Sequence, residues 1–226
     1  MKQLNANNIG RPAAVLAAAF ALTYSVFAIL SLLKLLPHPY ELFWQFLPSL
    51  LLAFTFVITI VCLHFTVPEE KKIYTALAAA FAVVYCSCVC IVYFTQIAVV
   101  IPQLLQQKIN DDHVLVFTDK SFMVAVDCIG YGLMCLSTLF AALAFKQDYR
   151  SRWLYRSLLF SGFLTPFTIA AFFIPAFLAV GALWIIAMPM ALINSAKWFS
   201  RNKKQPYNTS KQKNLKTEEI VEYDLQ

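Results

Sequence analysis

Charge is scarce in this chain. Asp, Glu, Lys and Arg make up 13% of its 226 residues, whereas apolar residues make up 60%. A soluble domain contains about 25% charged and about 45–50% apolar residues, so this composition does not suit a water-facing surface. The apolar residues form long blocks without the alternation of half-buried strands. These features exclude dinucleotide-binding folds, barrels of alternating strands and nucleic-acid-binding modules, and they predict an integral membrane protein.

Histidine is also scarce, which limits the possible cofactors. The three histidines are His38, His64 and His113. They are too few and too scattered for haem or a two-metal centre, and no predicted span carries a central lysine for a retinal Schiff base. One alternative stays open, because His38, Glu41 and the segment 111–113 could bind a metal ion if two outer loops touch. The sequence otherwise predicts no cofactor and no catalytic residue.

All six cysteines fall inside predicted spans. They are Cys62, Cys86, Cys88, Cys90, Cys128 and Cys135. Residues two apart in a helix point to different faces, so the three cysteines between 86 and 90 are a weak signal for metal binding. We expect the six to act as small apolar packing residues rather than as a disulfide framework.

The long apolar blocks predict an all-α bundle of six transmembrane helices over residues 1–199. A hydrocarbon core about 30 Å thick needs roughly 20 helical residues to cross it. Uncharged runs of suitable length occupy 13–33, 43–65, 73–101, 121–145, 157–174 and 176–196. The last two are continuous, and as one helix they would be about 60 Å long. Pro175 lacks a backbone donor and disfavours helix before it, so we predict a reversal there.

The positive charges predict the orientation. Twelve lysines and arginines lie on the side of the N-terminus and three lie on the other side, counting up to residue 204. Because short loops rich in Lys and Arg stay in the cytoplasm, both ends are predicted to be cytoplasmic. The first apolar run is longer than the core of a signal peptide, so we interpret it as an uncleaved anchor.

Residues 200–226 differ in composition from the rest of the chain. Six cations between 201 and 216 precede four acids, with few apolar residues to bury, so this tail is predicted to be disordered. Its basic half could contact anionic lipid headgroups. Alternatively, these cations only fix the topology.

Asp127 is the one charged residue inside a predicted span. A carboxylate at the bilayer centre costs about 2.5–3.5 kcal/mol, so its retention needs a reason. With a span beginning at Ser121, Asp127 lies about 9 Å below the outer rim. Gln96 on the third span lies at nearly the same depth. Tyr131 and Tyr93 are one helical turn from Asp127 and Gln96 respectively, so each shares a face with its polar neighbour.

Two further residues, Thr168 and Trp184, reach a comparable depth if the reversal at Pro175 is tight. No span contains a Lys or Arg, so Asp127 must be protonated, hydrated, or paired with a cation from elsewhere. We therefore predict a small ligand-binding site of Asp127, Gln96, Tyr93, Tyr131, Thr168 and Trp184, which opens outward and accepts a proton, an amine or another cation. Alternatively, a span starting near Val124 would place Asp127 in the first turn, where the helix dipole stabilises it.

Gly130 and Gly132 lie beside Asp127, and we interpret them as small residues that allow close helix contact. Three prolines, Pro48, Pro166 and Pro189, interrupt predicted spans. They indicate either plain kinks or breaks that line a substrate path.

Several short segments resemble those of uncharacterised bacterial six-span integral membrane proteins. They are Tyr93-Phe94-Thr95-Gln96, Ser121-Phe122-Met123, Asp127, Gly130-Tyr131-Gly132, Leu139-Phe140-Ala141-Ala142 and Gly181-Ala182-Leu183-Trp184. The resemblance covers the C-terminal half of the chain. It implies a six-helix bacterial membrane protein, and it carries no activity with it.

Three classes of function stay open. The first is a small transporter or ligand-binding membrane protein that uses Asp127. The second is a non-catalytic scaffold or subunit that packs against a protein partner or a second copy. The third is a lipid-modifying enzyme, which would need a second catalytic group within hydrogen-bonding reach of Asp127, and Tyr131 is the best candidate for that group.

Overall fold

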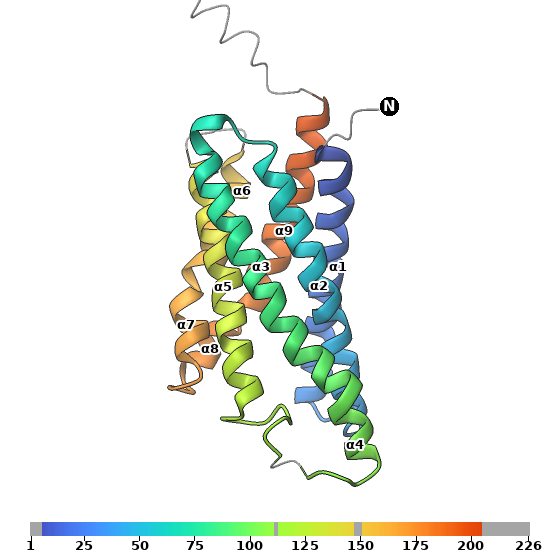
Figure 1. The fold of residues 1–226 in the computed structure, drawn as a ribbon. Coiled ribbons are helices and arrows are strands. Elements are labelled where there is room, and N and C mark those ends of the chain that lie inside the picture. Colours follow the sequence, from blue (N-terminus) through green and yellow to red (C-terminus); the bar gives the residue numbers. More distant parts are fainter. Residues whose placement is uncertain (1–5, 111–112, 147–150, 205–226) are drawn as a thin grey trace, which may run out of the picture.

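The computed structural model describes residues 6–110, 113–146 and 151–204, and every regular element in these ranges is helical. The elements are α1 (Ala6–Leu32), α2 (Tyr40–His64), the 3-10 turn η1 (Glu69–Lys71), α3 (Lys72–Thr95), the π-helical turn η2 (Gln96–Val100), α4 (Ile101–Leu105), α5 (Phe122–Phe145), α6 (Arg152–Phe163), α7 (Thr165–Ala170), α8 (Phe177–Gly181) and α9 (Trp184–Lys204). Figure 1 shows an elongated bundle in which the start of α1 and the end of α9 lie at the same end.

The predicted all-α bundle is confirmed. The predicted disordered tail falls almost entirely outside the described residues.

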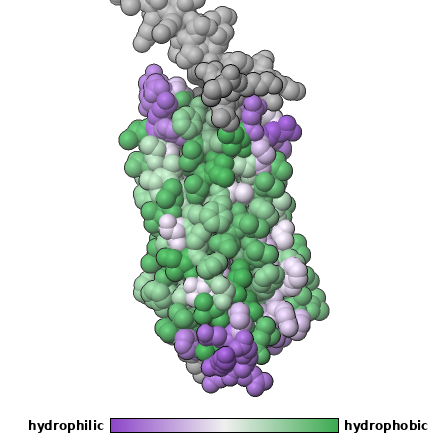
Figure 2. All heavy atoms as spheres, turned by 45° about the vertical axis from the view of Figure 1, so that its right-hand side comes forward, coloured by the Kyte–Doolittle hydropathy of each residue, from purple (hydrophilic) through white to green (hydrophobic). Residues whose placement is uncertain are grey.

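The sides of the bundle suit hydrocarbon. Five helical segments in the described ranges are long and apolar enough to cross a membrane, namely Ala6–Leu32, Tyr40–His64, Glu69–Leu105, Phe122–Phe145 and Phe177–Asn202. Figure 2 shows a broad hydrophobic belt on one face, with hydrophilic residues gathered at both ends. An apolar surface of this extent is unfavourable in water and favourable in lipid.

The predicted span 157–174 is not one continuous helix, which corrects the sequence-based expectation. α6 ends at Phe163 and α7 begins at Thr165. The cause is Pro166, which has no N–H and excludes the carbonyl four residues earlier, that of Gly162, from helical bonding. The Thr165 hydroxyl donates to this carbonyl instead, at 2.7 Å. The chain then reverses between α7 and α8, in a segment that contains Pro175, as predicted.

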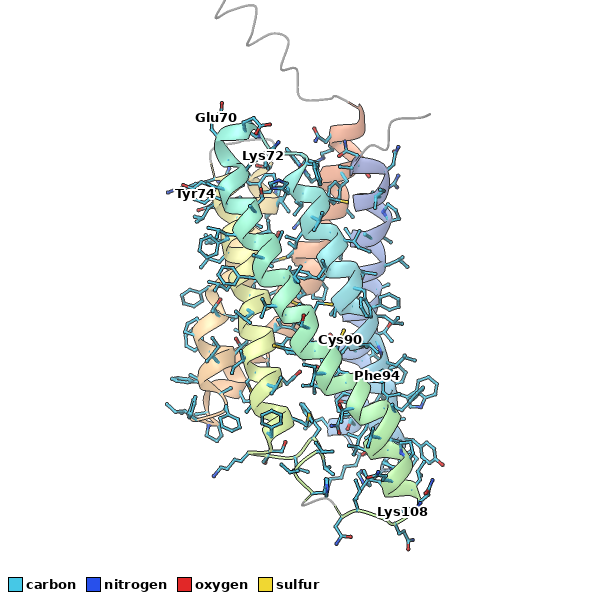
Figure 3. All side chains as sticks on the ribbon, in the orientation of Figure 1. Glu70, Lys72, Tyr74, Cys90, Phe94 and Lys108 are labelled. Atoms are coloured by element: carbon cyan, nitrogen blue, oxygen red, sulfur yellow. The ribbon has the colours of Figure 1, made fainter. Side chains whose placement is uncertain are left out.

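The helix of the third predicted span is longer than 73–101. It runs from α3 through η2 into α4, and Figure 3 shows it extending from Lys72 at one end of the bundle toward Lys108 at the other. The π-helical turn η2 begins at Gln96 and precedes Pro102. Proline removes one helical hydrogen bond, and a wider turn is one way in which a helix accommodates that loss.

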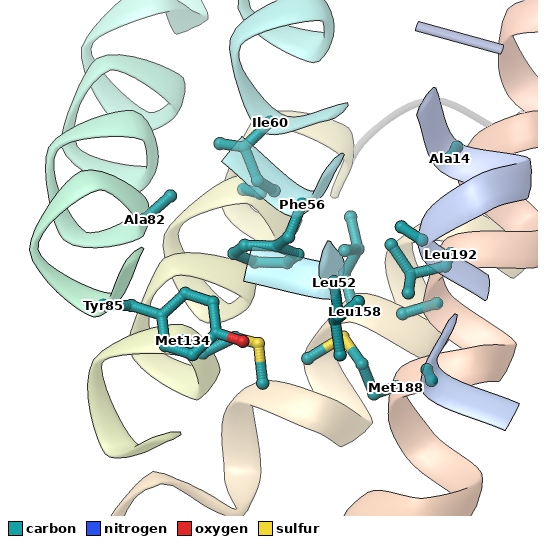
Figure 4. Close-up of a cluster of buried hydrophobic side chains, with 14 of the residues drawn as sticks. Ala14, Leu52, Phe56, Ile60, Ala82, Tyr85, Met134, Leu158, Met188 and Leu192 are labelled. Carbon is teal, nitrogen blue, oxygen red and sulfur yellow. The ribbon is translucent and has the colours of Figure 1, made fainter. Parts of the chain in front are cut away.

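The helices pack through small residues and a continuous apolar core. α1 contacts α2 and α9, α3 contacts α2 and α5, and α5 contacts α6 and α7. Ala14, Ala17 and Ala21 of α1 are fully buried, a spacing that lets neighbouring backbones approach closely. Figure 4 shows core side chains from six helices, among them Ala14, Phe56, Tyr85, Met134, Leu158 and Leu192.

Gly130 and the cysteines behave as packing residues. A Cβ at Gly130 would lie 3.2 Å from the Cβ of Cys88 on α3, so the predicted close contact is confirmed there. All six cysteines are free thiols. The Cys86 and Cys90 sulfur atoms are 3.9 Å apart on the same face of α3.

The tightest backbone approach occurs at Gly162, and it generates a prediction. A Cβ there would lie 2.6 Å from the Cβ and 2.7 Å from the Cα of Leu139 on α5. We expect Gly162→Ala to destabilise the bundle by about 1–3 kcal/mol, because α6 must move away from α5. Thermal unfolding in detergent measures the effect. Gly181→Ala is the control, since its Cβ would meet nothing closer than 3.8 Å, and equal melting temperatures for both variants would contradict the prediction.

Candidate functional site

Asp127 lies inside α5, beyond its first turn. The helix begins at Phe122, and the Ser121 hydroxyl caps it by accepting the Val124 N–H at 3.3 Å. The alternative placement of Asp127 in the first turn is therefore wrong, because the helix starts two residues before Val124. The Asp127 Oδ1 atom is shielded from solvent and has no hydrogen-bond partner among the described residues.

Two tyrosines join Asp127 from adjacent helices. The hydroxyl of Tyr93 on α3 lies 2.9 Å from the hydroxyl of Tyr131 on α5, and the two share a hydrogen bond. The Tyr93 side chain also lies close enough to the Asp127 carboxyl to interact with it. The carboxyl and the two phenols are therefore neighbours between α3 and α5, and Tyr131 shares a face with Asp127 as the helical spacing predicted.

Aromatic rings enclose these polar groups. Trp184, at the start of α9, meets Tyr131 edge-on with ring centroids 5.0 Å apart, and it meets Tyr24 of α1 at 5.7 Å. Tyr85 of α3 packs against Tyr131 at 5.9 Å. We call this group the Asp127 cluster, and it consists of Asp127, Tyr24, Tyr85, Tyr93, Tyr131 and Trp184. All four tyrosines of the cluster lie within electrostatic range of the Asp127 carboxyl.

Three buried polar atoms of the cluster lack a partner in the described part of the chain. They are Asp127 Oδ1, Tyr85 Oη and Trp184 Nε1. An unsatisfied buried polar group costs about 1–3 kcal/mol, so three in one place mark a functional candidate. The cluster contains no cation of its own, and the ion pairs His38–Glu41 and Lys72–Glu69 lie at the starts of α2 and α3.

Gln96 forms its hydrogen bonds with a loop and not with the carboxyl of Asp127. It is fully buried, its Nε2 donates to the Leu115 carbonyl at 2.6 Å, and its Oε1 accepts the Phe117 N–H at 3.2 Å. The Phe117 ring packs on Phe46 at 5.2 Å, and Phe46 stacks on Tyr93 at 5.1 Å. The segment 113–118 therefore covers the cluster at the predicted outer end of the bundle.

Thr168 on α7 makes no hydrogen bond to the Asp127 cluster. Its hydroxyl donates to the Thr165 carbonyl at 2.9 Å, and it lies near Gly132 and Cys135 of α5. Of the predicted site residues, the structure brings together Asp127, Tyr93, Tyr131 and Trp184. Gln96 and Thr168 are neighbours with hydrogen bonds elsewhere.

The sequence analysis missed Tyr24 and Tyr85. Tyr85 carries a readable signal, because it lies on one buried stripe of α3 with Val89, Val92 and Gln96, at helical spacing. Tyr24 carries no such signal. Its position next to Trp184 depends on α1 packing against α9, which periodicity within either helix does not reveal.

The described residues give little support to the metal site that the sequence left open at His38, Glu41 and segment 111–113. His38 Nδ1 lies 2.8 Å from Glu41 Oε1, and His113 Nδ1 accepts the Leu115 N–H at 3.3 Å. Residues 111–112 are outside the described ranges. Within those ranges, no three His, Cys, Asp or Glu side chains group closely enough to hold a metal ion.

The chain matches no protein-family model, no curated protein and no solved structure. The resemblance to bacterial six-span membrane proteins therefore remains a prediction. The function has to be argued from the chemistry of the site itself.

The anchoring of segment 113–118 by Gln96 generates a prediction. Replacing Gln96 with Leu removes both hydrogen bonds, worth about 1 kcal/mol each, so we expect the Phe117 amide to exchange its hydrogen at least about tenfold faster. Hydrogen exchange followed by mass spectrometry measures this rate. Gln106→Leu is the matched control, because Gln106 is exposed beyond the end of α4. Unchanged exchange in Gln96→Leu would show that the aromatic contacts alone hold the segment.

Proposed function

We propose that this protein is a small membrane transporter or ligand-binding membrane protein that takes up a cation at Asp127. The observation that carries the proposal is the buried Asp127 Oδ1 without a partner, in a cluster that contains no Lys or Arg. Intramembrane acids commonly mark ion pathways and proton relays, because a retained carboxylate is unfavourable in lipid.

The composition of the cluster favours a positively charged ligand. A carboxylate supplies the counter-charge, and the faces of Tyr and Trp rings attract ammonium groups. The phenols of Tyr93 and Tyr131 add two hydroxyls that can donate or accept. A proton, an amine or another small cation satisfies these groups, whereas an anion would meet repulsion from Asp127.

The route to the cluster is proposed to open at the end covered by segment 113–118. A proton needs little rearrangement there, since the linked hydroxyls of Tyr93 and Tyr131 lie beside the carboxyl and need only rotate to pass it on. An amine needs more room. The Phe117–Phe46 contact would have to separate before it could enter.

We also propose six crossings of a bacterial plasma membrane with both ends in the cytoplasm. The fifth crossing is then the broken pair α6–α7, whose 19 residues from Arg152 to Ala170 span about 28 Å. This length fits the hydrocarbon core. The position of both described chain ends at one end of the bundle supports an even number of crossings (Figure 1).

Reporter fusions test this topology. Alkaline phosphatase inserted after Asn110 should be active, because that loop is proposed to face the periplasm, whereas a fusion after Gln226 should be inactive. A fluorescent protein that matures only in the cytoplasm should give the reverse pattern. The same reporter active at both positions would contradict an even count of crossings.

Asp127→Asn tests the proposed cation site. Wild-type protein in vesicles of phosphatidylethanolamine and phosphatidylglycerol should carry protons, ethylammonium or tetramethylammonium above the flux of empty vesicles. We expect Asp127→Asn to reduce that flux at least about tenfold, because the neutral amide cannot pair with a cation. A pH-sensitive dye and electrical recording on supported membranes measure the fluxes.

Two controls separate loss of function from loss of fold. Asp119→Asn removes an exposed acid just before α5 and should leave the flux unchanged. The melting temperature of Asp127→Asn should be unchanged or higher, since an uncompensated buried charge has been removed. Wild-type flux equal to that of empty vesicles for all three probes would contradict the proposal and favour the non-catalytic membrane component.

A further inference from the structure

A surface groove runs between α1 and α9 at the end of the bundle where both chain ends lie. It encloses about 500 Å³ and is open along the side of the molecule. Three cations line it, namely Arg11 of α1 and Lys197 and Arg201 of α9. None of the three forms an ion pair with another described residue. Within the described part of the chain, the groove therefore presents three positive charges that no acid compensates.

The other lining residues are apolar and lie deeper along the same helices. Leu22 is eleven residues after Arg11, which places it about 16 Å further along α1. On α9, which runs in the opposite direction, Ile193 precedes Lys197 by one turn. Val15, Leu22 and Ile193 are each at least 40% exposed, so they form an apolar wall that the other described residues leave uncovered. The groove thus changes from cationic at the end of the bundle to apolar toward its middle.

A second hollow of about 300 Å³ adjoins the first. The two share Lys197 and Arg201, and the second adds Trp153 and Asn194 to its lining. Trp153 is largely exposed and stacks under the Arg156 guanidinium at 5.7 Å. Tryptophan favours the headgroup level of a bilayer, so the two shared cations lie at the depth where lipid phosphates lie.

We propose that this groove binds one anionic glycerophospholipid, with its phosphate on Arg11, Lys197 and Arg201 and an acyl chain along Val15, Leu22 and Ile193. Charge complementarity and the order of polar and apolar lining residues match such a lipid from headgroup to tail. Arginine suits this role because its planar guanidinium binds phosphate oxygens in pairs. The proposal is independent of Asp127 and of any transport activity.

The full-length protein in dodecyl maltoside provides the test, with native mass spectrometry to count bound lipid. We expect dioleoyl-phosphatidylglycerol to bind wild type at least about tenfold more tightly than dioleoyl-phosphatidylcholine. The triple variant Arg11→Gln, Lys197→Gln and Arg201→Gln should lose at least about tenfold in phosphatidylglycerol affinity, since each cation near an anionic lipid contributes roughly fivefold. The phosphatidylcholine affinity should stay the same.

A matched control removes three cations from the same end of the bundle, outside both hollows. Lys71→Gln, Arg152→Gln and Arg156→Gln together should retain phosphatidylglycerol binding within about twofold, because only general attraction is weakened. A variant that keeps the charges, Arg11→Lys with Lys197→Arg and Arg201→Lys, should also retain most of the binding. Melting temperatures measured without added lipid verify that all variants are folded.

Three results would overturn the proposal. Equal affinity of wild type for the two lipids would show that the cations do not select an anionic headgroup. Equal losses in the two triple variants would show a diffuse charge effect, in which the cations only fix topology. Displacement of phosphatidylglycerol by inorganic phosphate at equal concentration would assign the cations to a free anion, because a lipid with an acyl chain in the groove resists such exchange.

Discussion

The backbone hydrogen bonds are the constraint on which the fold depends, because hydrocarbon offers no substitute for them. Long helices satisfy most of these groups, and two prolines require a local adjustment. At Pro166 the freed Gly162 carbonyl accepts the Thr165 hydroxyl, and at Pro102 the preceding turn widens into η2. The turn η2 continues α3, and α7 packs on α5. Both adjustments therefore occur in elements that adjoin α3 and α5, the helices that carry Tyr93, Asp127 and Tyr131.

Buried polar side chains also need hydrogen-bond partners, and some of those in the Asp127 cluster lack one. Ser25, Thr59 and Ser195 are buried and donate to carbonyls of their own helices. Asp127 Oδ1 and Trp184 Nε1 have no such partner in the described ranges, although four helices converge on them. Aromatic contacts worth about 0.5–1.5 kcal/mol each hold these groups in place. Three such atoms lie together in the Asp127 cluster, where a ligand could satisfy them at one place.

Local periodicity accounts for the parts of the site that the sequence could predict. The i to i+4 spacing of Asp127 and Tyr131 indicated a shared face, and Tyr93 was indicated through its position one turn from Gln96, at nearly the depth of Asp127. The rest depends on contacts between distant segments. Gln96 bonds to a backbone some twenty residues later, and a glutamine in an apolar run gives no sign of that partner. Pro166 indicated a break after α6, whereas the apolar composition of residues 157–174 indicated one uninterrupted span.

Gln96 and Tyr93 lie one turn apart on the same helix, so segment 113–118 and the Asp127 cluster are both attached to a single short stretch of backbone. A shift of that stretch moves both. Thermodynamic reciprocity then follows: if a ligand on the Asp127 carboxyl loosens segment 113–118, loosening of the segment must change the affinity of the carboxyl for that ligand by the same factor. A molecule of this size could in this way couple occupancy to exposure without a separate moving domain.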